Sequence, residues 1–189
     1  EIYTSPHTLS LHALFRSMVA EAGAPDGGGF LERLELRAAP ELGPNALALP
    51  SGIVVVTDEL VGIAEHDDEL VAVLAHELGH VRGRHALRRL LRSVGVSALA
   101  FALIGDVSSA SALFGAVPAL IDAKHSRDFE READAFSRTW LARQGIEPDR
   151  FDAILCRMEH DEPAFGRYLS THPPTDERAR CASSETRDD

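Results

Sequence analysis

The chain contains 189 residues, 44% of them hydrophobic, and has a formal net charge of −11 at pH 7. This length can bury one substantial core, so we expect a single domain over residues 1–189 with peripheral tails at 1–9 and 182–189. The acidic balance argues against nucleic-acid binding through a basic surface. The two cysteines, Cys156 and Cys181, lack the spacing of a zinc knuckle, and the sequence allows them to be free or paired.

The first third of the chain predicts one helix and a small sheet. Apolar periodicity indicates a helix over residues 10–22. Alternating apolar residues predict strands over 31–37, 46–49 and 53–57, which we expect to form an antiparallel sheet. Thr57 is expected to cap a short helix that follows the last strand.

The next apolar pattern, residues 67–94, predicts one long amphipathic helix with acidic residues at its positive end. Within it, His76 and His80 lie one turn apart on the same face, and Glu77 lies next to the first histidine. This H-E-x-x-H pattern is typical of a zinc peptidase, in which two neutral imidazoles bind Zn²⁺ and the glutamate accepts a proton from water. Gly79 costs the helix roughly 1 kcal/mol, which indicates that another element packs closely against this turn.

A catalytic zinc usually has three protein ligands, and His85 is the nearest candidate for the third. The residues around it resemble the metzincin extension, but that extension requires a histidine at position 86, where Ala86 stands. On a continuous helix, His85 also points away from the face of His76 and His80. We therefore interpret His85 as a structural or surface histidine.

A largely apolar segment starts at Val94 and ends at Ile121. It contains two short apolar runs separated by a polar stretch, and neither run reaches the roughly 20 residues needed to span a bilayer. A buried helical hairpin, a shallow membrane contact and a subunit interface are all compatible with this composition.

Residues 126–136 predict another helix, on which Glu130 and Asp134 share a face one turn apart. Glu130 is the better candidate for the third zinc ligand. Asp134 would then accept a hydrogen bond from the non-ligating nitrogen of a zinc histidine. Glu132 belongs to the outer side of this helix. The alternative interpretation is a solvated helix face held by pairs of opposite charge.

The C-terminal part predicts two further helices, over residues 135–144 and 149–159, followed by a loop that carries His172. Two prolines follow this histidine directly. From residue type alone, a histidine in such a place is a loop residue without metal contact.

Five segments resemble gluzincin peptidases of the HtpX, CAAX prenyl protease and Oma type, and they occur in the order typical of that family. They are residues 45–57, residues 68–85, the apolar segment, residues 126–134, and residues 171–175 with Arg178. The resemblance covers about residues 10–180. It implies a mainly helical, zincin-like α+β metalloprotease domain with a small antiparallel sheet beside the zinc cleft.

The resemblance also implies roles for individual residues. One Zn²⁺ per chain would be bound by His76, His80 and Glu130, with Glu77 as the general base and Asp134 behind a zinc histidine. An edge strand that pairs with an extended substrate would contain Asn45, Ala46, Leu47 and Ala48. The resemblance favours a catalytic role for His172, in which the ring donates a hydrogen bond to the developing oxyanion. The alternative, as in periplasmic relatives, is that His172 occupies the open zinc position as an inhibitory fourth ligand.

We therefore expect a zinc metalloendopeptidase that cleaves polypeptides, and the resemblance implies damaged or misfolded envelope proteins as substrates. It also implies a place in the cell envelope, membrane-associated or periplasmic. The start at Glu1, without methionine or signal sequence, favours an excised soluble piece or a processed form. The alternatives are a zinc-stabilised binding or chaperone-like module without turnover and a latent protease that needs a partner. Glu77 argues against the first, because a structural zinc needs no base beside an open position.

Overall fold

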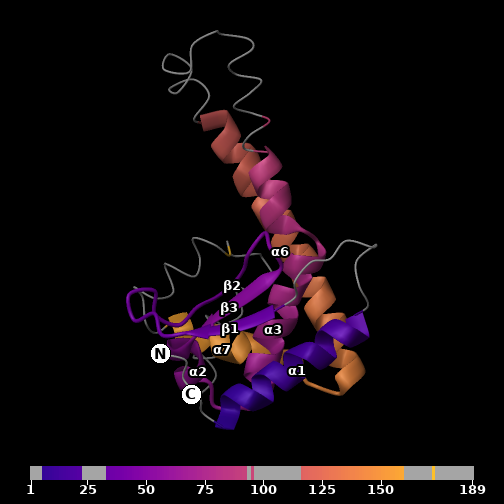
Figure 1. The fold of residues 1–189 in the computed structure, drawn as a ribbon. Coiled ribbons are helices and arrows are strands. Elements are labelled where there is room, and N and C mark those ends of the chain that lie inside the picture. The colour runs from indigo at the N-terminus through magenta and orange to yellow at the C-terminus, as the bar shows by residue number, and fades with distance from the viewer. Residues whose placement is uncertain (1–5, 23–32, 93–94, 96–115, 160–171, 173–189) are drawn as a thin grey trace, which may run out of the picture.

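A computed structural model of the chain describes residues 6–22, 33–92, 95, 116–159 and 172. In this part of the chain, helices pack against a small three-stranded sheet (Figure 1). The elements are α1 (Pro6–Ala22), β1 (Arg33–Arg37), β2 (Ala46–Ala48), β3 (Ile53–Thr57), α2 (Asp58–Ile63), α3 (Asp67–Arg82), α6 (Ala116–Gln144) and α7 (Asp149–Glu159). The expected α+β class with a majority of helix is confirmed. Helix α1 begins within the expected N-terminal tail.

The sheet has the strand order β1-β3-β2, and it is mixed rather than antiparallel. β2 runs antiparallel to β3, whereas β1 runs parallel to β3 with Leu34 opposite Val54. The expectation of a wholly antiparallel sheet is therefore wrong. Alternation of apolar residues indicates which face of a strand is buried, but it carries no information on the direction of the neighbouring strand.

Helix α3 forms the centre of the structure. Every residue from Glu69 to Val81 is buried, because α1, β2, β3, α6 and α7 all pack against this helix. The expected short helix before it is confirmed: the Thr57 hydroxyl accepts a hydrogen bond from the backbone N–H of Leu60 at 3.3 Å. A helix enclosed on all sides holds the side chains that it carries in fixed positions.

Glu69 fixes the first turn of α3 to the rest of the structure. Its buried carboxylate accepts a hydrogen bond from the backbone N–H of Glu65 at 2.9 Å and forms an ion pair with Arg157 of α7. Burial opposes ionisation, but Arg157 and the backbone N–H groups outweigh it and hold the pKa of Glu69 below its usual value. A negative charge here also interacts favourably with the positive end of the helix.

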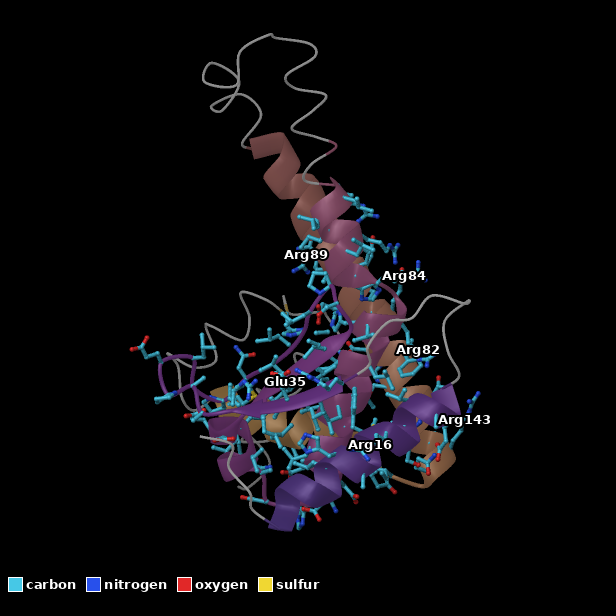
Figure 2. All side chains as sticks on the ribbon, viewed as in Figure 1. Arg16, Glu35, Arg82, Arg84, Arg89 and Arg143 are labelled. Atoms are coloured by element: carbon cyan, nitrogen blue, oxygen red, sulfur yellow. The ribbon has the colours of Figure 1, made fainter. Side chains whose placement is uncertain are left out.

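Helix α3 ends at Arg82, so the expectation of one continuous helix over residues 67–94 is wrong. Gly83 and Arg84 form a turn, and helical structure resumes at His85. Arg84 has a φ of +50°, outside the right-handed helical region. Figure 2 shows Arg84 and Arg89 on opposite sides of the segment that leads away from the sheet.

Helix α6 is a single helix that includes the two helices expected over residues 126–136 and 135–144. Pro118 does not interrupt this helix, because it lies in the first turn, where a backbone N–H has no helical partner. The apolar segment of residues 94–121 falls outside the described residues, except for residue 95 and the start of α6. Among the described residues, no helix is long and apolar enough to cross a membrane.

Candidate metal centre

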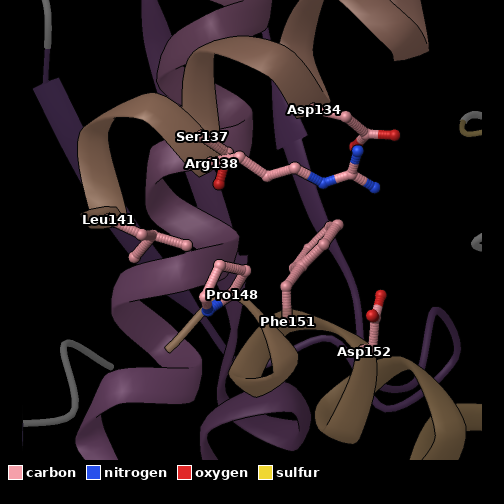
Figure 3. Close-up of a pocket in the computed structure, with 7 residues that line it drawn as sticks. All are labelled: Asp134, Ser137, Arg138, Leu141, Pro148, Phe151 and Asp152. Atoms are coloured by element: carbon pink, nitrogen blue, oxygen red, sulfur yellow. The ribbon is translucent and has the colours of Figure 1, made fainter. Parts of the chain in front are cut away.

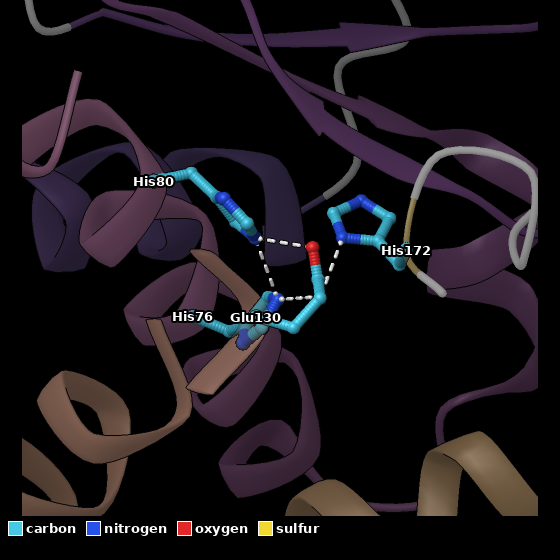
Figure 4. A group of neighbouring side chains, drawn as sticks. All are labelled: His76, His80, Glu130 and His172. Carbon is cyan, nitrogen blue, oxygen red and sulfur yellow. Dashed lines mark hydrogen bonds and ion pairs between the residues drawn. The ribbon is translucent and has the colours of Figure 1, made fainter. Parts of the chain in front are cut away.

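Four buried side chains from three parts of the chain converge between α3 and α6 (Figure 4). His76 and His80 come from α3, Glu130 from α6, and His172 from the C-terminal part of the chain. Their exposed fractions are 0%, 7%, 0% and 4%. Each offers one nitrogen or oxygen atom, and these four atoms lie within 4.8 Å of one another. The structure thus brings together residues that lie almost a hundred positions apart.

The Glu130 carboxylate lies against both histidines of α3. One of its oxygens is 3.3 Å from His76 Nε2, and the other is 3.4 Å from His80 Nε2. The two Nε2 atoms are 2.9 Å apart. The spacing of four residues along α3 places both imidazoles on one face, and the crossing of α6 supplies the carboxylate.

Protonation of these groups determines what the cluster can bind. His76 Nδ1 lies 3.0 Å from Asp134 Oδ1, a carboxylate oxygen that accepts, so Nδ1 carries a proton, and Nε2 presents a lone pair when the ring is neutral. Burial lowers the pKa of His80 to about 3, which keeps this ring neutral. Burial opposes ionisation of Glu130, but the imidazoles of His172, His76 and His80 that face its carboxylate outweigh it and hold its pKa well below its usual range.

Two neutral imidazoles and one ionised carboxylate therefore direct lone pairs at one buried position. Lone pairs directed at one position repel one another unless a cation lies between them. Imidazole nitrogen and carboxylate oxygen are common ligands of Zn²⁺, and two histidines with one glutamate are a known ligand set of catalytic zinc. The residues present fit a zinc ion.

Glu77 lies beside this cluster. Its side chain is fully buried, and neither carboxylate oxygen accepts a hydrogen bond in the part of the chain that the structure describes. The nearest ionisable group is His172, whose Nε2 lies 3.5 Å from Glu77 Oε1. A buried carboxylate without hydrogen bonds is costly, and this one lies beside four side chains that could hold a metal ion.

The close approach of α3 and α6 depends on Gly79. A Cβ atom at this position would lie 2.9 Å from the Cα of Ala133 and 3.1 Å from its carbonyl oxygen. The expectation that another element packs closely against this turn is confirmed. Because Ala133 lies between Glu130 and Asp134 on α6, this contact sets the distance of both carboxylates from α3.

Nothing in the sequence singled out Phe151, whose ring packs against the imidazole of His76. The two rings stack with centroids 5.0 Å apart at an interplanar angle of 26°. Phe151 and Asp134 also line a small pocket between α6 and α7 (Figure 3). The available signal was the apolar periodicity of residues 149–159, which predicts a buried face for α7 without indicating what it covers.

His85 does not point away from the metal-binding cluster. It is only 2% exposed, so its interpretation as a surface histidine is wrong. The break after α3 turns it back, and its Nδ1 lies 2.9 Å from His80 Nδ1. Its Nε2 lies 3.0 Å from Glu132 Oε2. Glu132 is on the outer side of α6 as expected, with a side chain 53% exposed, yet it contacts the cluster through His85.

β2 lies at the edge of the sheet in the described structure, as expected for residues 45–48. Asn45 O accepts a hydrogen bond from the backbone N–H of Thr57 at 3.0 Å, and Leu49 N–H donates to Ile53 O at 2.8 Å. Backbone groups alternate in direction along an antiparallel strand. Ala46 and Ala48 therefore direct their backbone groups away from β3.

His172 joins the edge of β2 to the metal-binding cluster. Its Nε2 lies 3.3 Å from Ala46 O, and its Nδ1 lies 3.3 Å from Glu130 Oε2. A loop histidine without contact to the cluster would not show this geometry. Both ring nitrogens face groups that the sequence indicated for metal or substrate binding.

Cys156 of α7 is disulfide-bonded. The only other cysteine of the chain is Cys181, which lies outside the described residues. A disulfide is typical of an oxidising compartment.

Comparison with known proteins gives one family. The sequence profile of peptidase family M48 matches residues 6–186. The mitochondrial metalloendopeptidase OMA1 of Schizosaccharomyces pombe is 29% identical over 93% of this chain and 52% of its own length. The metalloprotease YcaL of Escherichia coli is 33% identical over 72% of this chain and 56% of its own length. A protease HtpX homolog of Pyrococcus abyssi is 25% identical over 89% of this chain and 70% of its own length.

The chain thus spans about half the length of the first two of these relatives. The matches confirm the resemblance to peptidases of the HtpX and Oma type that the sequence motifs indicated.

Proposed function

The chain belongs to peptidase family M48, and we propose that it is a zinc-dependent metalloendopeptidase that hydrolyses peptide bonds in polypeptides. The observation that carries this proposal is the convergence of His76, His80 and Glu130 beside the buried carboxylate of Glu77. A binding site for a structural zinc would have no use for that carboxylate.

Three residues would hold one Zn²⁺ per chain: His76 and His80 through their Nε2 atoms, and Glu130 through its carboxylate. A bound zinc would supply Lewis-acid chemistry, which polarises a carbonyl and lowers the pKa of a water molecule. Glu77 would accept the proton of the attacking water and transfer it to the leaving amine. Asp134 would keep the proton of His76 on Nδ1, so that Nε2 remains a donor to the metal.

We propose that substrate pairs with the edge of β2. Ala46 and Ala48 direct their backbone groups away from β3, and an extended peptide can form main-chain hydrogen bonds with such an edge. Pairing there would bring a peptide carbonyl next to the metal-binding cluster, because Ala46 O is already within 3.3 Å of His172. Asn45 and Leu47, which face β3, would keep the strand in the sheet.

For His172 we propose the role of a fourth zinc ligand in a resting state of the enzyme. Its contacts with Glu130 and with the edge of β2 support this role, because a histidine placed there competes both with water at the metal and with a bound peptide. The second candidate role is donation of a hydrogen bond to the oxyanion. In His172→Ala, the resting-state role predicts increased turnover, the oxyanion role predicts a kcat lower by about 10²-fold, and unchanged kinetics would exclude both.

The disulfide of Cys156 supports a place in the cell envelope, membrane-associated or periplasmic, where oxidising conditions maintain such bonds. Leu90 and Leu91 are 51% and 62% exposed just before the apolar segment of residues 94–121. That segment is the candidate for membrane contact. Damaged or misfolded envelope proteins are the proposed substrates.

The test is a casein-degradation assay combined with zinc analysis of the wild type, Glu77→Gln and Glu41→Gln. Glu41 is an exposed glutamate outside the site and serves as the matched control. We expect one zinc per chain in all three proteins and a loss of cleavage of about 10²–10⁴-fold in Glu77→Gln alone. A wild type that binds zinc without cleaving casein would favour a non-catalytic or chaperone-like module, or a latent protease that needs a partner. Full activity of Glu77→Gln would contradict the assigned base.

A further inference from the structure

His85 lies immediately behind one of the proposed zinc ligands, and both of its ring nitrogens have partners. Its Nδ1 lies 2.9 Å from His80 Nδ1, and its Nε2 lies 3.0 Å from Glu132 Oε2. The ring is 2% exposed. His85 thus connects His80 to a carboxylate on α6 that does not itself touch the metal-binding cluster.

Two features of the backbone bring His85 to this position. Arg84 adopts a φ of +50°, a conformation that costs a non-glycine residue on the order of 1 kcal/mol. Gly83 carries no side chain at a point where an added Cβ atom would collide with the imidazole ring of His85. On an unbroken helix, a residue five positions after His80 would face elsewhere.

The surroundings of His85 hold the ring and its carboxylate partner in place. The ring stacks on Phe129 with centroids 4.4 Å apart and an interplanar angle of 10°. Arg88 donates hydrogen bonds to Glu132 at 3.1 Å and to the carbonyl of Gly83 at 3.3 Å. Arg88 also lies 4.5 Å from the centre of the Phe129 ring. Glu132 is therefore held in place although its side chain is half exposed.

The carboxylate of Glu132, at the end of this series of contacts, determines where the protons lie. A carboxylate only accepts, so His85 Nε2 carries a proton and donates it to Glu132. In a neutral ring, His85 Nδ1 is then an acceptor, so the proton between the two Nδ1 atoms belongs to His80 Nδ1. His80 Nε2 is consequently a lone pair that faces Glu130 at 3.4 Å. The proton arrangement is the same as the one that Asp134 imposes on His76.

We propose that His85 and Glu132 are positioning residues of the zinc site, which fix the tautomer and the ring orientation of His80. This inference rests on the proposed function, because it takes His80 as a zinc ligand. Each imidazole of α3 then has its own carboxylate on α6: Asp134 acts directly on His76, and Glu132 acts on His80 through His85. Loss of such an outer partner typically lowers metal affinity 10–100-fold.

The test measures zinc affinity by competition with a chelator. His85→Phe keeps an aromatic ring that can stack on Phe129 but removes both hydrogen bonds, and Glu132→Ala removes the carboxylate. Asp128→Ala is the matched control, because this acidic residue of α6 is similarly exposed and pairs with Arg131 at 3.0 Å. We expect zinc affinity to fall about 10–100-fold in His85→Phe, to fall in Glu132→Ala, and to be unchanged in Asp128→Ala.

A double variant and a spectrum separate positioning from general destabilisation. His85→Phe combined with Glu132→Ala should bind zinc no more weakly than His85→Phe alone, because the two residues act through one chain of hydrogen bonds. The visible absorption of the Co²⁺-substituted protein should differ between wild type and His85→Phe, since the ligand geometry changes. Wild-type affinity in both single variants, additive losses in the double variant, or an unchanged Co²⁺ spectrum would overturn the inference. A wild type that binds no zinc would instead refute the proposed function.

Discussion

Replacing Gly79 by alanine tests whether the crossing of α3 and α6 sets the geometry of the metal centre. An added Cβ would lie 2.9 Å from Ala133 Cα, whereas ordinary contacts begin at 3.4 Å. Backbone atoms cannot swing aside as a flexible side chain can, so the helices must separate by about 0.5 Å at this point. Glu130 and Asp134 lie on either side of Ala133, so both carboxylates would move away from the histidines of α3.

The stability change in Gly79→Ala is the balance of two opposing effects. Alanine improves helix propensity by about 1 kcal/mol, while overpacking of a close contact costs about 1–3 kcal/mol. We therefore expect the metal-free protein to lose up to about 2 kcal/mol of unfolding free energy. The zinc dissociation constant should rise by about tenfold or more, because outer-partner geometry controls affinity at that scale.

Urea unfolding of the metal-free protein and chelator competition measure these two quantities. Gly62→Ala is the matched control: Gly62 lies in helix α2, and a Cβ there would meet nothing within 4 Å. It should keep wild-type zinc affinity and gain stability. If Gly79→Ala bound zinc as tightly as the wild type and was equally stable, the close crossing would not be what positions the carboxylates of α6.

Three further outcomes follow from the same structure. Glu130→Ala should lose stoichiometric zinc and unfold more easily, because metal binding is linked to folding. Glu132→Ala should retain zinc at saturating metal. If metal analysis showed zinc in Glu130→Ala and none in Glu132→Ala, the ligand assignment would be wrong. Ala48→Pro removes an N–H from the side of β2 that faces away from β3, so it should raise KM or abolish cleavage with zinc retained. Ala48→Val keeps that N–H and should remain near wild type, and equal KM values in the two variants would remove the edge-strand proposal. Glu69→Gln should lose about 1.5–3 kcal/mol of unfolding free energy at pH 7. The pKa of Glu69 is lowered in the folded state, so its stabilisation is present above the unfolded pKa and is lost as pH falls through the folded pKa. The difference in unfolding free energy between wild type and Glu69→Gln should therefore shrink below about pH 4.5. A constant difference down to pH 3 would contradict the ion pair with Arg157.

Helix α3 shows what the sequence could predict. Its start and the close contact at Gly79 are indicated by local signals, namely the acidic residues and a helical glycine. Apolar periodicity predicts one buried face, whereas every residue from Glu69 to Val81 is buried. The spacing of His76 and His80 also anticipated that both rings share one face. The convergence of Glu130 with them was expected because three ligands are usual at a catalytic zinc, and the structure brings these residues together.

The end of α3 shows what the sequence could not predict. The apolar pattern continues beyond Gly83, so it indicated a continuous helix, although glycine after the last turn is a usual stop signal. The pairing of His85 with Glu132 depends entirely on that break and on contact between residues 47 positions apart. The parallel pairing of β1 with β3 was missed for a similar reason, because strand direction is decided by long-range packing rather than by alternation.

The most direct test of the metal centre is anomalous diffraction at the zinc absorption edge from crystals of the zinc-loaded protein. We predict a single peak per chain, in contact with His76 Nε2, His80 Nε2 and a Glu130 oxygen at the distances of about 2.0–2.2 Å that are typical of zinc. A peak at another site, or a zinc ion bound without Glu130, would contradict the account.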